Sequence, residues 1–102
     1  MAAAANQDIE DGMVELPVIL DLPAAAPLTE RLLALRGSSL IIDASKVEKL
    51  GGQCLQVLLS AIATWKADGA CLAIVEASEG FDAGLRLLGL NQDTLIAMEL
   101  RA

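Results

Sequence analysis

The sequence predicts an α/β fold: one small domain with a mixed, mostly parallel sheet of about four strands packed by amphipathic helices. Its 102 residues match the size of a single domain. Hydrophobic residues make up 55% of the chain, too many for a disordered protein. Short apolar runs alternate with segments whose leucines recur every three or four residues, and this alternation is typical of parallel strands joined by helices.

The N-terminal part is predicted to hold a tail and a broken strand. Residues 1–13 form an acidic, flexible tail in this interpretation, because they carry three acids, no base and little periodicity. The folded domain then spans residues 14–102. Residues 13–20 are interpreted as a strand interrupted at Pro17, which has no N–H to donate, with Val18–Leu20 as its better part.

The next segment predicts a helix followed by a strand. Pro27 suits the first position of the helix, and Gly37 suits its end. Its buried stripe consists of Leu28, Leu32 and Leu35. Leu40–Ala44 is a short apolar run without alternation, which predicts a strand buried on both faces. Residues 45–52 are then expected to form a polar loop.

A long helix is predicted from Gln53 to Gly69, with an apolar strand at Ala70–Val75 after it. The inner stripe of this helix contains Leu55, Leu58, Leu59, Ile62 and Trp65. Ser78 is a good N-cap for a last helix that ends at Gly89. The inner stripe of that helix is Phe81, Leu85 and Leu88. Residues 90–102 predict a short terminal element that covers the core.

Composition excludes several functions. The net charge of −7 and two aromatic residues disfavour nucleic acid as a partner. The absence of histidine removes the commonest general base and metal ligand, so we expect no enzyme, no metal and no cofactor. Cys54 and Cys71 are expected to be buried free thiols. No signal peptide or membrane-spanning run is apparent, which predicts a cytoplasmic protein.

The loop from Ser45 to Gln56 is the most informative place for a site. It follows the carboxyl end of a buried strand, where open α/β sheets usually bind ligands and partners. Its candidate partner-binding residues are Lys46, Lys49, Gly51, Gly52, Gln53 and Gln56. The lysines predict a locally basic edge for an acidic partner, and the glycines permit close approach or an anion at the helix start. A tight turn is the alternative explanation of the glycines, and solvent exposure that of the lysines. Asp21 and Asp43 follow strands and are expected to serve turns and caps rather than acid–base catalysis.

The segments LIIDASKVEKLGGQCLQVLLSAIATWKADGACLAIVEAS and FDAGLRLLGL resemble the STAS domain of anti-sigma-factor-antagonist-like proteins. Asp43 matches the strand-end aspartate of this family. Residues 50–55 occupy its Asp-Ser-Ser-Gly-Leu-like helix start, and residues 87–90 match its Leu-x-Gly-Leu helix end. The resemblance covers residues 14–93 and implies a protein-interaction module.

The helix start departs from the phosphorylatable members of this family. They carry Ser or Thr where this chain has Gly52, so the resemblance implies a module without the phosphorylation switch. Within the family the chain looks most like CheS-like proteins of chemotaxis operons, which implies a histidine kinase or response regulator as partner. The alternatives are an anti-sigma factor antagonist that works without phosphorylation and a soluble STAS subunit of an ABC-type lipid transporter. The oligomeric state stays open.

Overall fold

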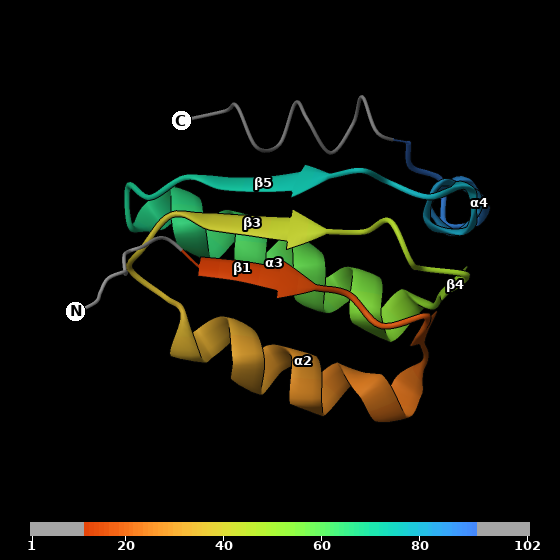
Figure 1. Ribbon diagram of the computed structural model, residues 1–102, viewed down its shortest axis with the longest axis horizontal. Helices are drawn as coiled ribbons and strands as arrows, with labels where there is room; N and C mark the ends of the chain where they lie inside the picture. Colours follow the sequence, from red (N-terminus) through yellow and green to blue (C-terminus); the bar gives the residue numbers. More distant parts are fainter. Residues whose placement is uncertain (1–11, 92–102) are drawn as a thin grey trace.

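The computed structural model describes residues 12–91, whose strands form two parallel sheets (Figure 1). The larger sheet has the order β1-β3-β5, with Val14 opposite Ile42 and Ile42 opposite Ile74. Its strands are β1 (Gly12–Glu15), β3 (Leu40–Asp43) and β5 (Leu72–Val75). The smaller sheet pairs β2 (Ile19–Leu20) with β4 (Lys49–Leu50). β1 therefore begins inside the segment that the sequence assigned to the tail.

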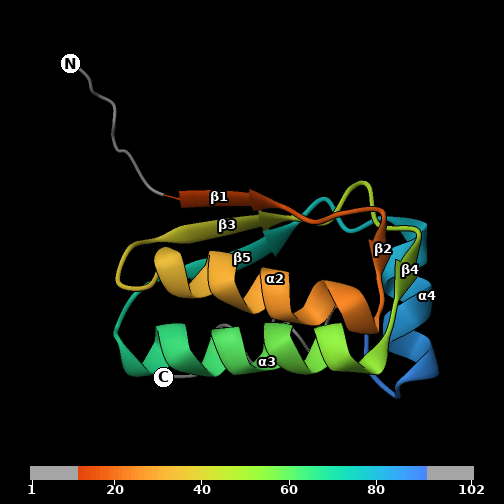
Figure 2. The same ribbon diagram turned by 90° about the horizontal axis from the view of Figure 1, so that it is seen from below.

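The helices form one layer and one end of the molecule. They are α2 (Leu22–Ala34), α3 (Gly52–Ala67) and α4 (Glu79–Leu87). Figure 2 shows α2 and α3 side by side beneath the larger sheet, whereas α4 lies beside the small sheet at one end. The predicted α/β class is confirmed. Residues 12–91 contain five strands in two sheets, where about four were expected.

The larger sheet buries the face that looks toward α2 and α3. Val14 and Ile42 have no exposed surface, and Leu40 has 1%. On the opposite face, Met13 is 62% exposed and Ile41 is 43% exposed. The prediction that Leu40–Ala44 is buried on both faces is therefore wrong. Within the described part of the chain, α2 and α3 cover only one face of this sheet.

Helix α2 begins five residues before the predicted start. It opens at Leu22 with Pro23 in its first turn, where a missing N–H costs no intrahelical bond. Pro27, the predicted first residue, lies inside the helix. The stripe is confirmed at Leu28 and Leu32, which are buried, while Leu35 is half-buried.

Several predictions about single residues near the other elements were wrong. The polar loop after β3 contains β4, because Lys49–Leu50 pairs with the short strand β2. Leu88 is 44% exposed rather than part of the inner stripe, and Cys71 is exposed. Leu59 is half-buried, because it lies beside the inner stripe of α3 rather than on it.

The ends of the helices follow the predicted signals. The Phe81 N–H donates to Ser78 Oγ at 3.1 Å, so the predicted N-cap of α4 is confirmed. Gly69 and Gly89 have φ of +70° and +84°, a conformation that glycine adopts without strain at the end of a helix. The predicted terminal element at residues 90–102 lies outside the described residues from residue 92 onward. No helix within residues 12–91 is long and apolar enough to cross a membrane.

Two glycines let α4 pack directly on backbone. A Cβ on Gly80 would lie 2.6 Å from the carbonyl oxygens of Val47 and Glu48. A Cβ on Gly84 would lie 2.6 Å from Leu50 Cβ. Real Cβ atoms essentially never approach so closely. The contact of α4 with the β3–β4 segment therefore requires glycine at both positions, one helical turn apart.

Gly80→Ala is expected to lower the free energy of unfolding by about 1–3 kcal/mol, because the added methyl group displaces backbone rather than a flexible side chain. Gly52→Ala is the matched control, since a Cβ there meets only Leu88 Cδ2 at 4.0 Å. Urea unfolding measures both changes. Equal stability of the two variants would contradict the close packing of α4.

Candidate protein-docking site

The starts of α2 and α3 and the end of α4 converge on one edge of the molecule. The Gly51 N–H donates to the Leu20 carbonyl oxygen at 2.8 Å, and Cys54 Sγ donates to the Asp21 carbonyl oxygen at 3.3 Å. These bonds hold the two helix starts together. A Cβ on Gly52 would lie 4.0 Å from Leu88 Cδ2, which places the end of α4 against the start of α3.

This edge exposes apolar side chains around a glycine. Leu22 at the start of α2 is 66% exposed, and Leu88 after α4 is 44% exposed. Gly52 and Gln53 at the start of α3 are also exposed. We call the surface formed by Leu22, Gly51, Gly52, Gln53 and Leu88 the docking edge. Exposed apolar groups grouped around a flat backbone surface are typical of protein-binding sites.

The two glycines of the docking edge have different roles. A Cβ on Gly51 would lie 3.2 Å from the Leu20 carbonyl oxygen, so Gly51 serves the close approach of the chain to β2. Gly52 has no such neighbour, since Leu88 Cδ2 at 4.0 Å is an ordinary contact. The tight-turn explanation therefore accounts for Gly51 and leaves Gly52 unexplained by packing among the described residues.

The docking edge presents two helix starts with the same electrostatic sign. The N-cap residues of α2 and α3, Asp21 and Gly51, make no side-chain bond to the helix backbone. Neither helix carries an acid in its first turn. The first backbone N–H groups of a helix have no intrahelical partner and carry positive partial charge. Those of α3 can therefore donate hydrogen bonds to a carboxylate or carbonyl oxygen of another molecule.

The predicted lysines are separated by the fold. Lys49 lies exposed in β4, two residues before Gly51. Lys46 Nζ instead lies 3.1 Å from Glu15 Oε2, which places it at the carboxyl end of β1. It lines a hollow of the β3–β4 loop together with Glu48 and Glu79. The structure thus brings Lys49 to the docking edge and surrounds Lys46 with carboxylates.

The predicted glutamines extend the docking edge along α3. Gln53 and Gln56 are both exposed and lie one turn apart on the helix, as their spacing predicts. Both line a groove of about 340 Å³ between α2 and α3. Together with Lys49, Gly51 and Gly52, five of the six candidate residues therefore lie along one continuous surface.

The two strand-end aspartates do not form a catalytic pair in this arrangement. Asp43 Oδ1 accepts the Ser45 N–H at 2.8 Å, and this bond lowers the pKa of Asp43 below its ordinary value. Asp43 thus serves a turn, as expected. Asp21 occupies the N-cap position of α2 without a side-chain cap bond.

Cys54 is poorly suited to act as a nucleophile. Cys54 is buried, and desolvation, followed by the nearby Asp21 charge, raises the pKa of its thiol. A thiol with a raised pKa stays protonated and unreactive near neutral pH. Within residues 12–91, no group of three or more His, Cys, Asp or Glu side chains could hold a metal ion.

The sequence did not reveal the exposed leucines of the docking edge. Leu22 and Leu88 lie 66 positions apart in the sequence, and only the tertiary fold brings the start of α2 and the end of α4 to the start of α3. A weak signal exists in the pair Leu87 and Leu88. Consecutive residues of a helix point about 100° apart, and the inner side of α4 is occupied by Phe81 and Leu85, so Leu87 is 87% exposed.

Comparison with protein families identifies the family of the chain. The family described as "Mlab, STAS domain" matches residues 3–99. No curated protein and no solved structure is significantly similar to the chain. The match spans nearly the whole sequence, and STAS domains act in protein–protein interactions, with anti-sigma-factor antagonism as one such role. The chain therefore belongs to the STAS-domain family.

Proposed function

We propose that this chain is a non-catalytic, cytoplasmic STAS module that docks on a bacterial histidine kinase or response regulator, as in chemotaxis, without being phosphorylated. The single observation that carries the docking proposal is the open surface at Gly52. It lies at the uncapped start of α3, it is free of packing constraints, and exposed Leu88 stands beside it.

The chemistry of the docking edge favours a partner segment with an acidic or carbonyl group next to an apolar one. The oxygen would accept N–H groups at the start of α3, and the apolar group would cover Leu22 and Leu88. Lys49, exposed beside Gly51, adds positive charge to the same place. A rim charge of this kind mainly speeds the encounter with an acidic partner.

The absence of a hydroxyl at position 52 supports docking that does not depend on a serine kinase. Ser60 lies eight residues along α3, about 12 Å away at the helical rise. Ser45 lies in the hollow of the β3–β4 loop with Glu48 and Glu79. Neither hydroxyl stands at the helix start. Control of this module would then rest on its abundance or on changes in its partner.

A second candidate follows from the description of the matching family, which names Mlab. It is a soluble STAS subunit that binds the ATPase of an ABC-type lipid transporter. The same docking edge would serve this function, since both need a surface for a protein and no catalytic group. The two candidates therefore differ in the partner rather than in the site.

Gly52→Trp tests the proposal. The indole should occupy the surface that the partner covers, so affinity should fall by about 100-fold or more, as expected for the centre of an interface. Affinity purification of the wild-type chain from cells of its source, with mass spectrometry, identifies the partner. A kinase or regulator favours the first candidate, and a transporter ATPase favours the second.

Ala63→Trp is the matched control, because it adds the same indole at an exposed position of α3 away from the docking edge. Circular dichroism checks that both variants fold. Titration of the purified partner then compares them. Unchanged affinity of folded Gly52→Trp would remove the docking edge from the interface.

A further inference from the structure

The groove between α2 and α3 has a feature that the docking edge alone does not explain. Leu33 lies on its α2 side and is 58% exposed, although it sits beside the buried Leu32. Val57 and Ala61 line the same groove from α3. The groove thus presents an apolar floor with one large, solvent-exposed leucine on its rim.

The lining of the groove follows one side of α3 over its length. The α3 residues in it recur at three- and four-residue intervals from Gln53 to Trp65, which spans about 18 Å of helix. Such a stripe is the surface that one helix offers to another. Figure 2 shows α2 running alongside α3, so the two helices together form walls for a third element.

Charge indicates what this third element is like. None of the described residues that line the groove is charged, and its polar groups are amides and hydroxyls such as Gln56 and Ser60. Residues 12–91 carry nine acids and six bases, so charge is kept out of the groove on an otherwise charged surface. An occupant that matches this lining has an uncharged, largely apolar contact face.

Backbone hydrogen bonding indicates that the occupant is a helix. The walls α2 and α3 satisfy their own backbone groups along the groove, so they offer no edge for a strand to pair with. A docked strand or irregular segment could pair its N–H and C=O groups only with scattered side-chain amides and hydroxyls such as those of Gln56 and Ser60. A helix satisfies them internally and buries only side chains.

We propose that the α2–α3 groove binds an amphipathic helix of the protein partner, about three turns long, whose contact face is apolar and uncharged. This inference rests on the proposed function, because the groove continues from the docking edge through Gln53. In the resulting interface, the partner helix covers Leu33 and lies along α3. One end of it reaches the start of α3 beside Gly52.

Site-specific photo-crosslinking in cells of the source tests the proposal. A photoreactive phenylalanine analogue is placed at position 53, 60 or 63. Positions 53 and 60 lie in the groove, whereas the side chain at position 63 is exposed and outside it. We expect crosslinks to one partner from positions 53 and 60 and none from 63. Mass spectrometry should map the crosslink from position 60 to an amphipathic helical segment.

Several outcomes would overturn the helix proposal while leaving the docking edge in place. These are a crosslink from position 53 without one from 60, a crosslink from 60 to a strand or loop, and a crosslink from 60 to a second copy of this chain. If position 53 gives no crosslink and Gly52→Trp binds normally, the proposed function itself fails. The helix proposal fails with it.

A second measurement uses the purified partner. Leu33→Gln should weaken binding about tenfold, because it removes the large apolar side chain that the partner helix covers on the rim of the groove. Met13→Gln is the matched control, since Met13 is similarly exposed, at 62% against 58% for Leu33, but lies on the far face of the larger sheet. Both substitutions replace exposed apolar side chains and should leave the fold intact. Equal affinities of the two variants would contradict the groove as a binding site.

Discussion

Trp65→Ala is expected to lower the free energy of unfolding by about 3–5 kcal/mol. Trp65 is only 2% exposed and belongs to the core cluster between α3 and the larger sheet. It is the only tryptophan of the chain, and the smaller side chain would leave a cavity that the helices cannot close fully. Thermal and urea unfolding by circular dichroism measure the loss.

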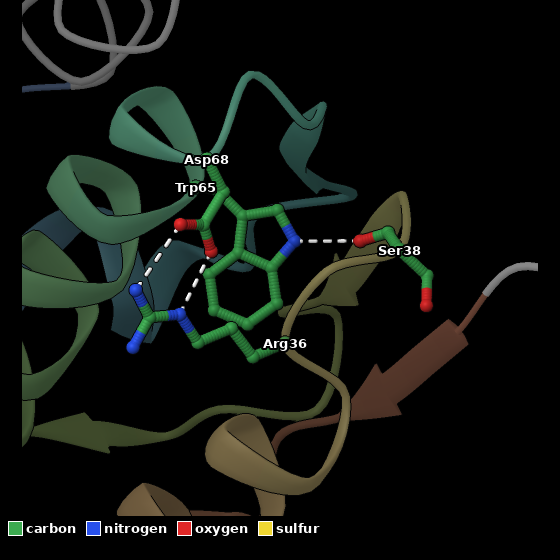
Figure 3. A network of polar contacts seen from close by, with 4 residues as sticks. All are labelled: Arg36, Ser38, Trp65 and Asp68. Carbon is green, nitrogen blue, oxygen red and sulfur yellow. Dashed lines mark hydrogen bonds and ion pairs between the residues drawn. The ribbon is translucent and has the colours of Figure 1, made fainter.

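The indole also ties two chain segments together (Figure 3). Its Nε1–H donates to the Ser38 carbonyl oxygen at 2.7 Å, which holds the turn after α2 against the end of α3. Arg36 makes two bonds to Asp68 across the same junction, at 2.8 Å and 3.1 Å. Because this ion pair is exposed to solvent, it adds much less to stability than the buried indole.

Two further variants separate packing from hydrogen bonding at this junction. Trp65→Phe keeps an aromatic ring but loses the N–H donor and some volume, so it should cost clearly less than Trp65→Ala. Asp68→Asn breaks only the exposed ion pair and should change stability little. A cost of Trp65→Phe equal to that of Trp65→Ala would mean that the bond to Ser38, rather than packing, dominates.

The sequence predicted best where a signal is local. The stripe of α3, the Ser78 cap and the glycines that end α3 and α4 all follow from neighbouring residues. It failed at α2 because two prolines suit a helix start. Leu22 begins the helix and Pro23 fills the favourable position, which local reasoning gave to Pro27. Propensity alone could not choose between them.

Contacts between distant segments explain the other places where the structure differs from the sequence prediction. Lys49–Leu50 is too short and too polar to indicate a strand, and it becomes β4 only because β2 lies next to it. Ile41 looked buried because an apolar run cannot reveal how many faces of the sheet are covered. For the candidate site, the helix start at Gly51 and Gly52 was visible in the sequence. Its exposed leucines were not, since separate elements bring them there.

Leu58→Ala is expected to lower the free energy of unfolding by about 2–5 kcal/mol. Leu58 has no exposed surface and lies on the inner stripe of α3, packed in the core cluster beneath the sheet. Removing three carbon atoms there loses buried apolar contact and leaves a cavity. Urea unfolding at constant m-value measures the change in stability.

Leu59→Ala is the matched control for Leu58→Ala, because it deletes the same atoms one residue further along α3. Leu59 is half-buried at the margin of the core, so its side chain loses less contact and its place can fill with water. We therefore expect Leu59→Ala to cost clearly less than Leu58→Ala. Equal costs would mean that α3 is rotated on the sheet, and the positions of Gln53 and Gln56 in the α2–α3 groove would change with it.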